Sequence, residues 1–196
     1  MKKRSICSRC HYPQNVCVCG AISCITIPLQ LVVLQHPLET RHAKNTARLI
    51  PLCIPNTQTF VGQSEQDFTE LKQQLVKTNK TAWVLYPNSQ SQPLEDYQQH
   101  YPDTLPDVLI VIDATWRKAT KMWQLNPWLH VLPSWHFNAL PENQYRIRKT
   151  QLAHSLSTLE AAAQGLKILT KRDVKPLLRL FDEMQIQQEK HMPKHG

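Results

Sequence analysis

The sequence predicts an α/β protein whose core is a parallel β-sheet. Residues 29–34, 82–86 and 108–112 form three short apolar runs. These runs are continuous rather than alternating, which is typical of strands buried on both faces of a parallel sheet. Helical patterns lie between and after them, and this alternation of strands with helices favours the α/β class. The chain has 196 residues, of which 41% are hydrophobic, and this suits one domain with a small appendage.

Five segments of the chain are expected to be helical. Residues 40–50 can form a helix that Pro51 should end, because proline lacks the N–H that a helix interior requires. The stretch Ser157-Thr-Leu-Glu160 is a capping box, which places a helix start at Ser157. The remaining helices are expected over 67–78, 116–125 and 174–189. The Gln-, Pro- and Asp-rich segment 89–106 is interpreted as a loop with little structure of its own.

Four of the six cysteines lie in the first 19 residues, in the pattern C-x2-C-x6-C-x-C. Such spacing lets four thiolates surround one tetrahedral zinc ion, and metal binding would then stabilise a segment too short to build a core. Two disulfides are the alternative, but the basic start of the chain lacks the apolar region of a secretory signal, and a reducing compartment disfavours disulfides. The sequence therefore predicts a zinc knuckle over residues 1–25, with Cys7, Cys10, Cys17 and Cys19 as ligands.

Composition and charge exclude several classes of protein. The four glycines are too scattered for a dinucleotide-binding or phosphate-binding glycine loop. The longest apolar run is too short to span a bilayer, so we expect a cytoplasmic protein with no membrane partner. The net charge is +8, with an excess of +4 in residues 1–30 and +6 in residues 113–196 around a near-neutral middle. A basic surface attracts polyanions, and nucleic acid is the expected partner, with solubility alone as the alternative.

Polar residues follow each predicted strand, where ligands of open α/β sheets bind. Asp113 comes directly after the third strand, at a helix start, and is either an N-cap or a general base. Glu39 is the second candidate for the base. Trp116 either covers the site, where it could stack on a base, or packs against the fold.

Basic residues near Asp113 and at the N-terminus form the candidate RNA-binding set. A carboxylate surrounded by cations suits a base within an RNA-binding surface, and equally a solvated face with an ordinary cap. Tyr145 lies within a basic stretch and could stack on an unpaired base. The candidates are Lys2, Lys3, Arg4, Arg9, Arg117, Lys118, Lys121, Tyr145, Arg146, Arg148 and Lys149.

Several motifs, in order along nearly the whole chain, resemble the DTW-domain family. The namesake stretch is Asp113-Ala-Thr-Trp116, and the N-terminal cysteine pattern with Arg9 and Pro13 precedes it. The other motifs are LQHPLE at 34–39, NTARL at 45–49, LYP at 85–87, RKA at 117–119, LNPW at 125–128, YRIRK at 145–149 and LSTLEA at 156–161. Each motif is weak alone, but together they are specific.

The resemblance implies a tRNA-uridine aminocarboxypropyltransferase. Such enzymes are similar to SPOUT-type proteins, with an α/β domain, here residues 26–190, and a C-terminal trefoil knot that holds S-adenosylmethionine. They move the 3-amino-3-carboxypropyl group to N3 of a tRNA uridine, here expected in the variable loop, and release methylthioadenosine. Residues 191–196 would be a disordered tail. Asp113 would take the N3 proton, which makes it and Trp116 the expected catalytic residues.

We expect knot loops to hold S-adenosylmethionine without a glycine cradle. Free N–H groups at the helix start near Ser157 would suit its carboxylate. The expected cofactor-binding residues are His36, Pro37, Thr46, Leu85, Tyr86, Pro87, Asp113, Ala114, Thr115, Leu156, Ser157 and Thr158.

Two other functions stay open at this point, as does the oligomeric state. A SPOUT-like methyltransferase would use the same cofactor but release S-adenosylhomocysteine. A non-catalytic zinc-knuckle RNA-binding protein would leave tRNA nucleosides unchanged. The chain is expected to be a monomer or a homodimer.

Overall fold

A computed structural model describes residues 5–42, 44–141, 143–147 and 156–190. In this part of the chain six strands form one sheet, and every neighbouring pair is parallel. The strands are β1 (Gln30–Gln35), β2 (Gln58–Val61), β3 (Ala82–Leu85), β4 (Gln92–Pro93), β5 (Val108–Asp113) and β6 (Ser134–His136), in the order β2-β1-β5-β3-β6-β4. The predicted α/β class is confirmed, and the three predicted strands are the three at its centre, β1, β5 and β3.

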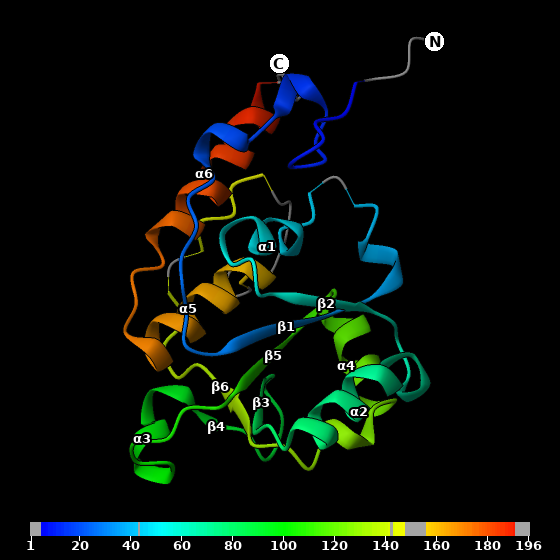
Figure 1. Cartoon of the computed structure of the whole chain (residues 1–196), viewed down its shortest axis with the longest axis vertical. Helices are drawn as coiled ribbons and strands as arrows, with labels where there is room; N and C mark the ends of the chain where they lie inside the picture. The colour runs from blue at the N-terminus through cyan, green and yellow to red at the C-terminus, as the bar shows by residue number, and fades with distance from the viewer. Residues whose placement is uncertain (1–4, 43, 142, 148–155, 191–196) are drawn as a thin grey trace.

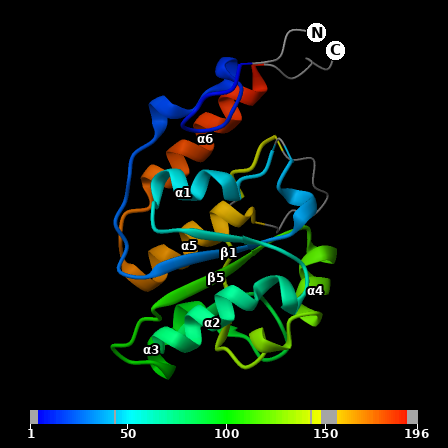
Figure 2. The same cartoon turned by 45° about the vertical axis from the view of Figure 1, so that its right-hand side comes forward.

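Helices cover both faces of the sheet (Figures 1 and 2). The helices are α1 (Ile50–Cys53), α2 (Thr69–Thr78), α3 (Tyr97–His100), α4 (Trp116–Gln124), α5 (Thr158–Thr170) and α6 (Lys175–Glu189). Helices α1, α5 and α6 lie on one face, and α2 and α4 on the other. Within the described ranges, none of these helices is long and apolar enough to cross a membrane.

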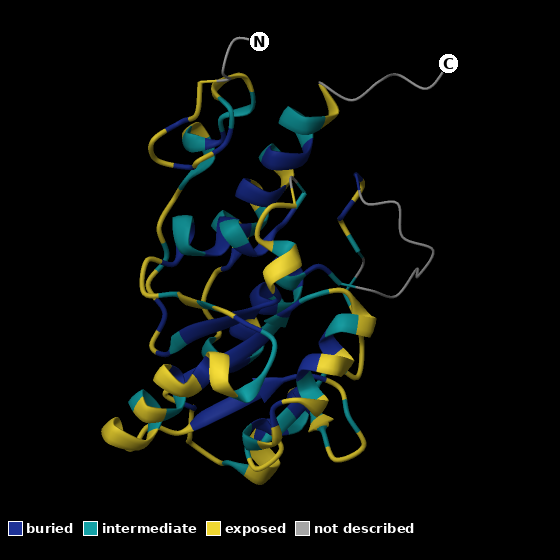
Figure 3. Ribbon diagram, turned by 90° about the vertical axis from the view of Figure 1, so that its right-hand side faces the viewer, coloured by how far each residue is buried: buried dark blue, intermediate teal, exposed yellow. Residues whose placement is uncertain are grey.

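Side chains of each central strand point alternately into two separate cores. In β5, Leu109 and Val111 join the core under α5 and α6, whereas Val108 and Ile110 join the core against α2 and α4. This alternation follows from the two-residue period of a strand. Both sets are apolar because both faces are covered, which explains the continuous apolar runs in the sequence. Figure 3 shows the buried sheet at the centre of the fold.

The helix predicted over 40–50 is wrong. Residues Ala47–Leu49 form only a single 3-10 turn, and α1 begins at Ile50, so that Pro51 lies in its first turn. Proline loses no hydrogen bond there, because the first N–H groups of a helix have no intrahelical acceptor. The residues before this turn therefore form a loop, and this loop carries Asn45 to the edge of the sheet.

The segment 89–106 holds more structure than the sequence predicts. It contains β4, a 3-10 turn at Leu94–Asp96, and α3. The side chains of Leu94 and Tyr97 are buried in the core below α5. Strands β2, β4 and β6 are also absent from the prediction. Strand β2 is largely exposed, and β4 and β6 have only two and three residues, so none of them produces an apolar run.

Helix α5 lies close to the sheet beside the edge where the strands end. Its capping box is confirmed, because the Ser157 side chain accepts from the backbone N–H of Glu160 and the Glu160 carboxylate accepts from that of Ser157. Gly165 faces the sheet, and a Cβ there would lie 3.3 Å from a methyl group of Leu85. The absence of a side chain therefore lets the helix pack closely over β3 and β5.

Candidate active site

Asp113 is the last residue of β5 and lies next to Gln35, the last residue of β1. The parallel register pairs these two positions directly. Gln35 Nε2 donates to Asp113 Oδ2 over 2.8 Å. The Asp113 side chain thus lies at the carboxyl ends of the central strands, the edge at which ligands of open α/β sheets bind.

Two further donors reach the Asp113 carboxylate from distant parts of the chain. Asn45 Nδ2 donates to Oδ2 over 2.7 Å, and Thr158 Oγ1 at the start of α5 donates to Oδ1 over 2.6 Å. Asp113 is only 5% exposed. A buried carboxylate needs such donors, because leaving its oxygens without partners would be costly. Thr115, not Asp113, is the N-cap residue of α4, so the N-cap alternative for Asp113 is wrong.

Two of the cations expected around this carboxylate are paired with other acids. Lys118 Nζ lies 2.8 Å from the Glu39 carboxylate. Arg146 turns toward α6, where it pairs with Asp182 at 2.8 Å and Glu189 at 3.3 Å. The three donors to Asp113 are therefore an amide, an amide and a hydroxyl, all neutral.

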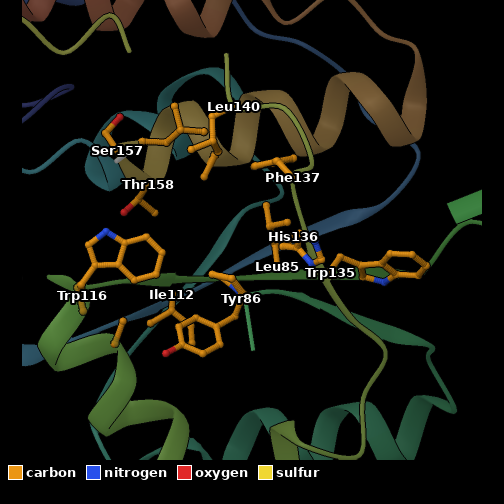
Figure 4. A pocket seen from close by; sticks show the side chains of 15 residues that line it. Leu85, Tyr86, Ile112, Trp116, Trp135, His136, Phe137, Leu140, Ser157 and Thr158 are labelled. Atoms are coloured by element: carbon orange, nitrogen blue, oxygen red, sulfur yellow. The ribbon is translucent and has the colours of Figure 1, made fainter. Parts of the chain in front are cut away.

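An apolar pocket of about 370 Å³ opens beside this edge of the sheet, and we call it the apolar pocket. Its volume is within the range of small-molecule sites. Figure 4 shows Ser157, Thr158 and Leu140 along one side and Trp116, Ile112 and Tyr86 along the other. The lining residues are Leu85, Tyr86, Pro87, Ile112, Ala114, Trp116, Ala119, Trp135, His136, Phe137, Leu140, Leu156, Ser157, Thr158 and Ala161.

A second pocket, of about 400 Å³ and lined mostly by polar side chains, contains Asp113, and we call it the polar pocket. It is lined by Glu39, His42, Lys44, Asn45, Thr46, Asp113, Ala114, Thr115, Tyr145, Ser157 and Thr158. Ala114, Ser157 and Thr158 line both pockets. Two ligands, one in each pocket, would therefore meet at the start of α5.

The structure brings together most of the residues predicted to bind the cofactor. Those that line the apolar pocket are Leu85, Tyr86, Pro87, Ala114, Leu156, Ser157 and Thr158, and those that line the polar pocket include Thr46, Asp113 and Thr115. His36 and Pro37 line neither pocket. The backbone N–H of His36 donates to the Asp113 carbonyl oxygen over 3.0 Å, and its ring atom Nδ1 accepts from the backbone N–H of Leu38.

Several lining residues were not predicted from the sequence. His136 ends β6, and Phe137 and Leu140 follow it; this strand is too short to be detected from its pattern. Asn45 and Lys44 lie in the segment that was expected to be helical. Asn45 could have been predicted as a site residue from the NTARL motif at 45–49, because this motif is one of those shared with the family.

The predicted RNA-binding residues are distributed over several surfaces. Arg117 and Lys121 are exposed on α4, and Arg9 is exposed in the cysteine segment. The Tyr145 ring is buried and lines the polar pocket, and its hydroxyl donates to the Lys44 carbonyl oxygen. Lys2, Lys3, Arg4, Arg148 and Lys149 lie outside the described residues.

Four cysteine sulfurs near the N-terminus converge on one point and could hold a metal ion. All four lie within 4.8 Å of one another, with Cys7 and Cys19 at 3.5 Å and Cys10 and Cys17 at 3.7 Å. Ligands on a tetrahedral zinc ion with bonds of about 2.3 Å are about 3.8 Å apart, so the spacing fits. Backbone N–H groups of Cys10 and Arg9 lower the pKa of Cys7 to about 6, which favours the thiolate that binds metal.

The cysteine segment is attached to the rest of the protein by Arg48 and α6. The Arg48 guanidinium donates to the His11 carbonyl oxygen over 2.9 Å and lies 4.0 Å above the Tyr12 ring. Tyr12 and Val18 are buried in the same core as Phe181 of α6. Figures 1 and 2 show this segment beside α6.

Together, the fold and the site define an α/β protein with a parallel sheet, a buried carboxylate at its ligand-binding edge and a four-cysteine group. The family model of the DTW domain matches residues 4–189, and the chain belongs to this family. No solved structure matches the chain.

Curated relatives of the chain carry one kind of name. The chain is 30% identical over 176 residues to tRNA-uridine aminocarboxypropyltransferase 2 of Macaca fascicularis. These aligned residues cover 88% of this chain and 59% of the relative. It is 31% identical over 177 residues to the protein of the same name in Drosophila melanogaster, covering 87% and 68%. It is 28% identical over 138 residues to tRNA-uridine aminocarboxypropyltransferase A of Arabidopsis thaliana, covering 61% and 50%.

Proposed function

We propose that this protein transfers the 3-amino-3-carboxypropyl group of S-adenosylmethionine to N3 of a uridine in tRNA, in the variable loop. The names of its relatives support the tRNA uridine and the transferred group. The position of Asp113, buried at the edge of the sheet yet lining the polar pocket, is the observation that carries the proposal. It offers an acceptor for the proton that must leave N3.

The reaction requires one proton transfer and one displacement. Asp113 accepts the N3 proton, and the N3 lone pair then forms a bond to Cγ of the aminocarboxypropyl group. The bond between Cγ and sulfur breaks, its electron pair stays on sulfur, and methylthioadenosine leaves. The sulfonium activates both Cγ and the methyl carbon, so the pockets must decide which carbon faces N3.

We assign the donor molecule to the apolar pocket. Trp116, Leu140 and Phe137 offer apolar contacts for the adenosine, and Trp116 is 45% exposed. At the start of α5 the capping box takes the backbone N–H groups of Ser157 and Glu160, and Thr46 accepts from that of Leu159, so we do not assign these groups to the carboxylate of the methionine part. Because Ser157 and Thr158 line both pockets, Cγ would lie near the uridine. The SPOUT-like fold with its trefoil knot, the cytoplasmic location and the oligomeric state stay predictions.

Zinc in the four-cysteine group is part of the same proposal. Cys7, Cys10, Cys17 and Cys19 would hold it, and the ion would stabilise a segment with little apolar core of its own. We assign it no step in the transfer.

The test is a transfer assay on unmodified tRNA with S-adenosylmethionine, in which mass spectrometry detects both products. We expect 3-(3-amino-3-carboxypropyl)uridine and methylthioadenosine in equal amounts. Asp113→Ala should lower the rate about 10²–10⁴-fold, the usual contribution of a general base. Asp107→Asn, at the opposite end of β5, should keep the wild-type rate.

Two results would count against the proposal. S-adenosylhomocysteine and a methylated uridine would instead show the methyltransferase alternative. Full activity of the Asp113→Ala variant would exclude Asp113 as the base.

A further inference from the structure

We propose that the polar pocket is the nucleobase site and that it selects uracil by one lone pair of Asp113. This inference rests on the proposed function and adds how the protein distinguishes uracil from the other bases. The apolar pocket does not include Asp113 among its lining residues, whereas the polar pocket does. A base whose ring nitrogen gives its proton to Asp113 must therefore enter the polar pocket.

The hydrogen bonds to Asp113 leave one acceptor position for a ligand. A carboxylate has about four lone-pair positions, two on each oxygen. Gln35 and Asn45 both donate to Oδ2 and fill it. Thr158 donates to Oδ1, so that one lone pair of Oδ1 is left within the described site. Asp113 thus presents a single fixed lone pair to the pocket rather than two.

Tyr145, which also lines the polar pocket, is held in place as well. The hydroxyl of Tyr145 is bonded to the Lys44 backbone, which fixes the ring. The neighbouring backbone N–H groups are bonded to buried side chains, that of Gln144 to Glu160 over 2.7 Å and that of Arg146 to Gln185 over 2.6 Å. A rigid aromatic wall and a fixed acceptor suit a flat heterocycle that enters from a flipped nucleotide.

A single acceptor distinguishes the bases by their hydrogen-bonding edges. Uracil presents one N–H at N3 between two carbonyl oxygens, and the same pocket is lined by Lys44 and Thr115, whose side chains carry donor groups. The Lys44 ammonium also donates to the Ile147 carbonyl oxygen over 2.7 Å. Cytosine presents a lone pair at N3, which would face the carboxylate and repel it. Guanine presents two adjacent N–H groups, and Asp113 could accept from only one of them.

The experiment titrates the protein with uridine, cytidine, guanosine and N3-methyluridine 5′-monophosphates. Site-specific binding is followed by the ¹⁵N signal of the Asn45 side-chain amide, which is bonded to Asp113. We expect uridine monophosphate to shift this signal and to bind at least about tenfold more tightly than the other three, the cost of one buried unpaired group.

An Asp113→Asn variant should reverse the preference. Gln35 and Asn45 still require an acceptor, so the amide oxygen should face them and the amide nitrogen should face Thr158 and the pocket. The variant then offers an N–H in place of a lone pair, and cytidine monophosphate should bind more tightly than uridine monophosphate. Asp107→Asn removes a carboxylate at the opposite end of β5, outside both pockets, and serves as the control, which should keep the wild-type order.

The outcomes separate this inference from the proposed function. Three results would overturn the inference even if transfer to tRNA occurs. The four nucleotides could bind equally, uridine monophosphate could leave the Asn45 signal unshifted, or the Asp113→Asn variant could keep the wild-type order of affinities. The expected order without any transfer would support the nucleobase site and count against the proposed reaction. A reversal in Asp107→Asn as well would show that net charge, not the Asp113 lone pair, sets the preference.

Discussion

Asp113 is buried, and no ion pair joins it to a cation in the part of the chain that the structure describes. Pairing it with a buried arginine would add a second charge to desolvate, and the gain from such pairs is often small. Three neutral donors satisfy the carboxylate instead, and hydrogen bonds to a charged group are stronger than neutral ones. The orientation of the carboxylate is therefore set by hydrogen bonds from fixed parts of the fold.

Arg48 offers a test of how the cysteine segment is held. Arg48→Ala removes the hydrogen bond to His11 and the packing of the guanidinium on the Tyr12 ring. We expect the free energy of unfolding to fall by about 1–3 kcal/mol, the usual range for a hydrogen bond to a charged group together with a cation–π interaction. Chemical denaturation measures this change.

The control for this change is Arg41→Ala, an exposed arginine of the same loop. It should leave stability within about 0.5 kcal/mol, as for most surface substitutions. Metal content should be the same in both variants, since neither residue belongs to the four-cysteine group. Equal stability of Arg48→Ala and wild type would show that other interactions hold the segment.

The sequence predicts the position of Asp113 but not its environment. An acid directly after an apolar run points to the ligand-binding edge of a parallel sheet. Gln35 becomes its partner only through the register of β1 against β5, and Asn45 only because residues 44–46 do not form the predicted helix. Neither the register nor the loop path is readable from one sequence, since both depend on interactions between distant segments.

Elements with strong local signals are the ones the sequence predicts well. The capping box at Ser157, the amphipathic α4 and the apolar runs of β1, β3 and β5 each carry their own pattern. Pro51 shows the limit of such signals, because proline both ends helices and begins them. Only the packing of Ile50 and Cys53 into the core decides between the two.

Asp67 offers a test at the start of α2. Backbone N–H groups of Gln63 and Ser64 lower the pKa of its carboxyl, since they stabilise the charged form. A lowered pKa in the folded state stabilises the protein above the unfolded-state pKa of about 3.9, and this contribution is lost as the pH falls through the folded-state pKa. Asp67→Asn should therefore cost about 1 kcal/mol at neutral pH, as the loss of a cap does.

The measurement is the free energy of unfolding from neutral pH to about pH 2. The difference between wild type and Asp67→Asn should shrink toward acid pH, because wild-type Asp67 becomes neutral there. Asp103→Asn is the matched control, as Asp103 is exposed with a φ of 57° that asparagine also tolerates. A constant difference at all pH values would contradict the assignment.

Across the whole molecule, the positive charge is used in two different ways. Arg146 and Lys118 are paired with acids of the same chain, whereas Arg117 and Lys121 are exposed on α4. The start of α4 lies at the edge of the sheet that carries both pockets. The number of basic residues predicted to bind RNA near the site therefore exceeds the number available for it, because Lys118 and Arg146 are paired with acids.

Arg117 and Lys121 are expected to bind the tRNA backbone. Replacing both by glutamine should weaken tRNA binding and reduce the slope of log K against log salt by about 0.9 for each phosphate that is no longer neutralised. Filter binding at several salt concentrations measures this. Lys80→Gln, a change at the opposite edge of the sheet, should leave the slope unchanged, and an equal effect of Lys80→Gln would indicate non-specific attraction by net charge alone.

The origin of Asp113 and its three donors has a consequence for folding. Gln35, Asn45, Asp113 and Thr158 come from two strands, a loop and a helix start, spread over more than half of the chain. No fragment that lacks α5 can complete this set, and no partly folded chain with a slipped strand register can either. Binding competence should therefore appear only in the last cooperative step of folding, which makes the site a reporter of the finished native state.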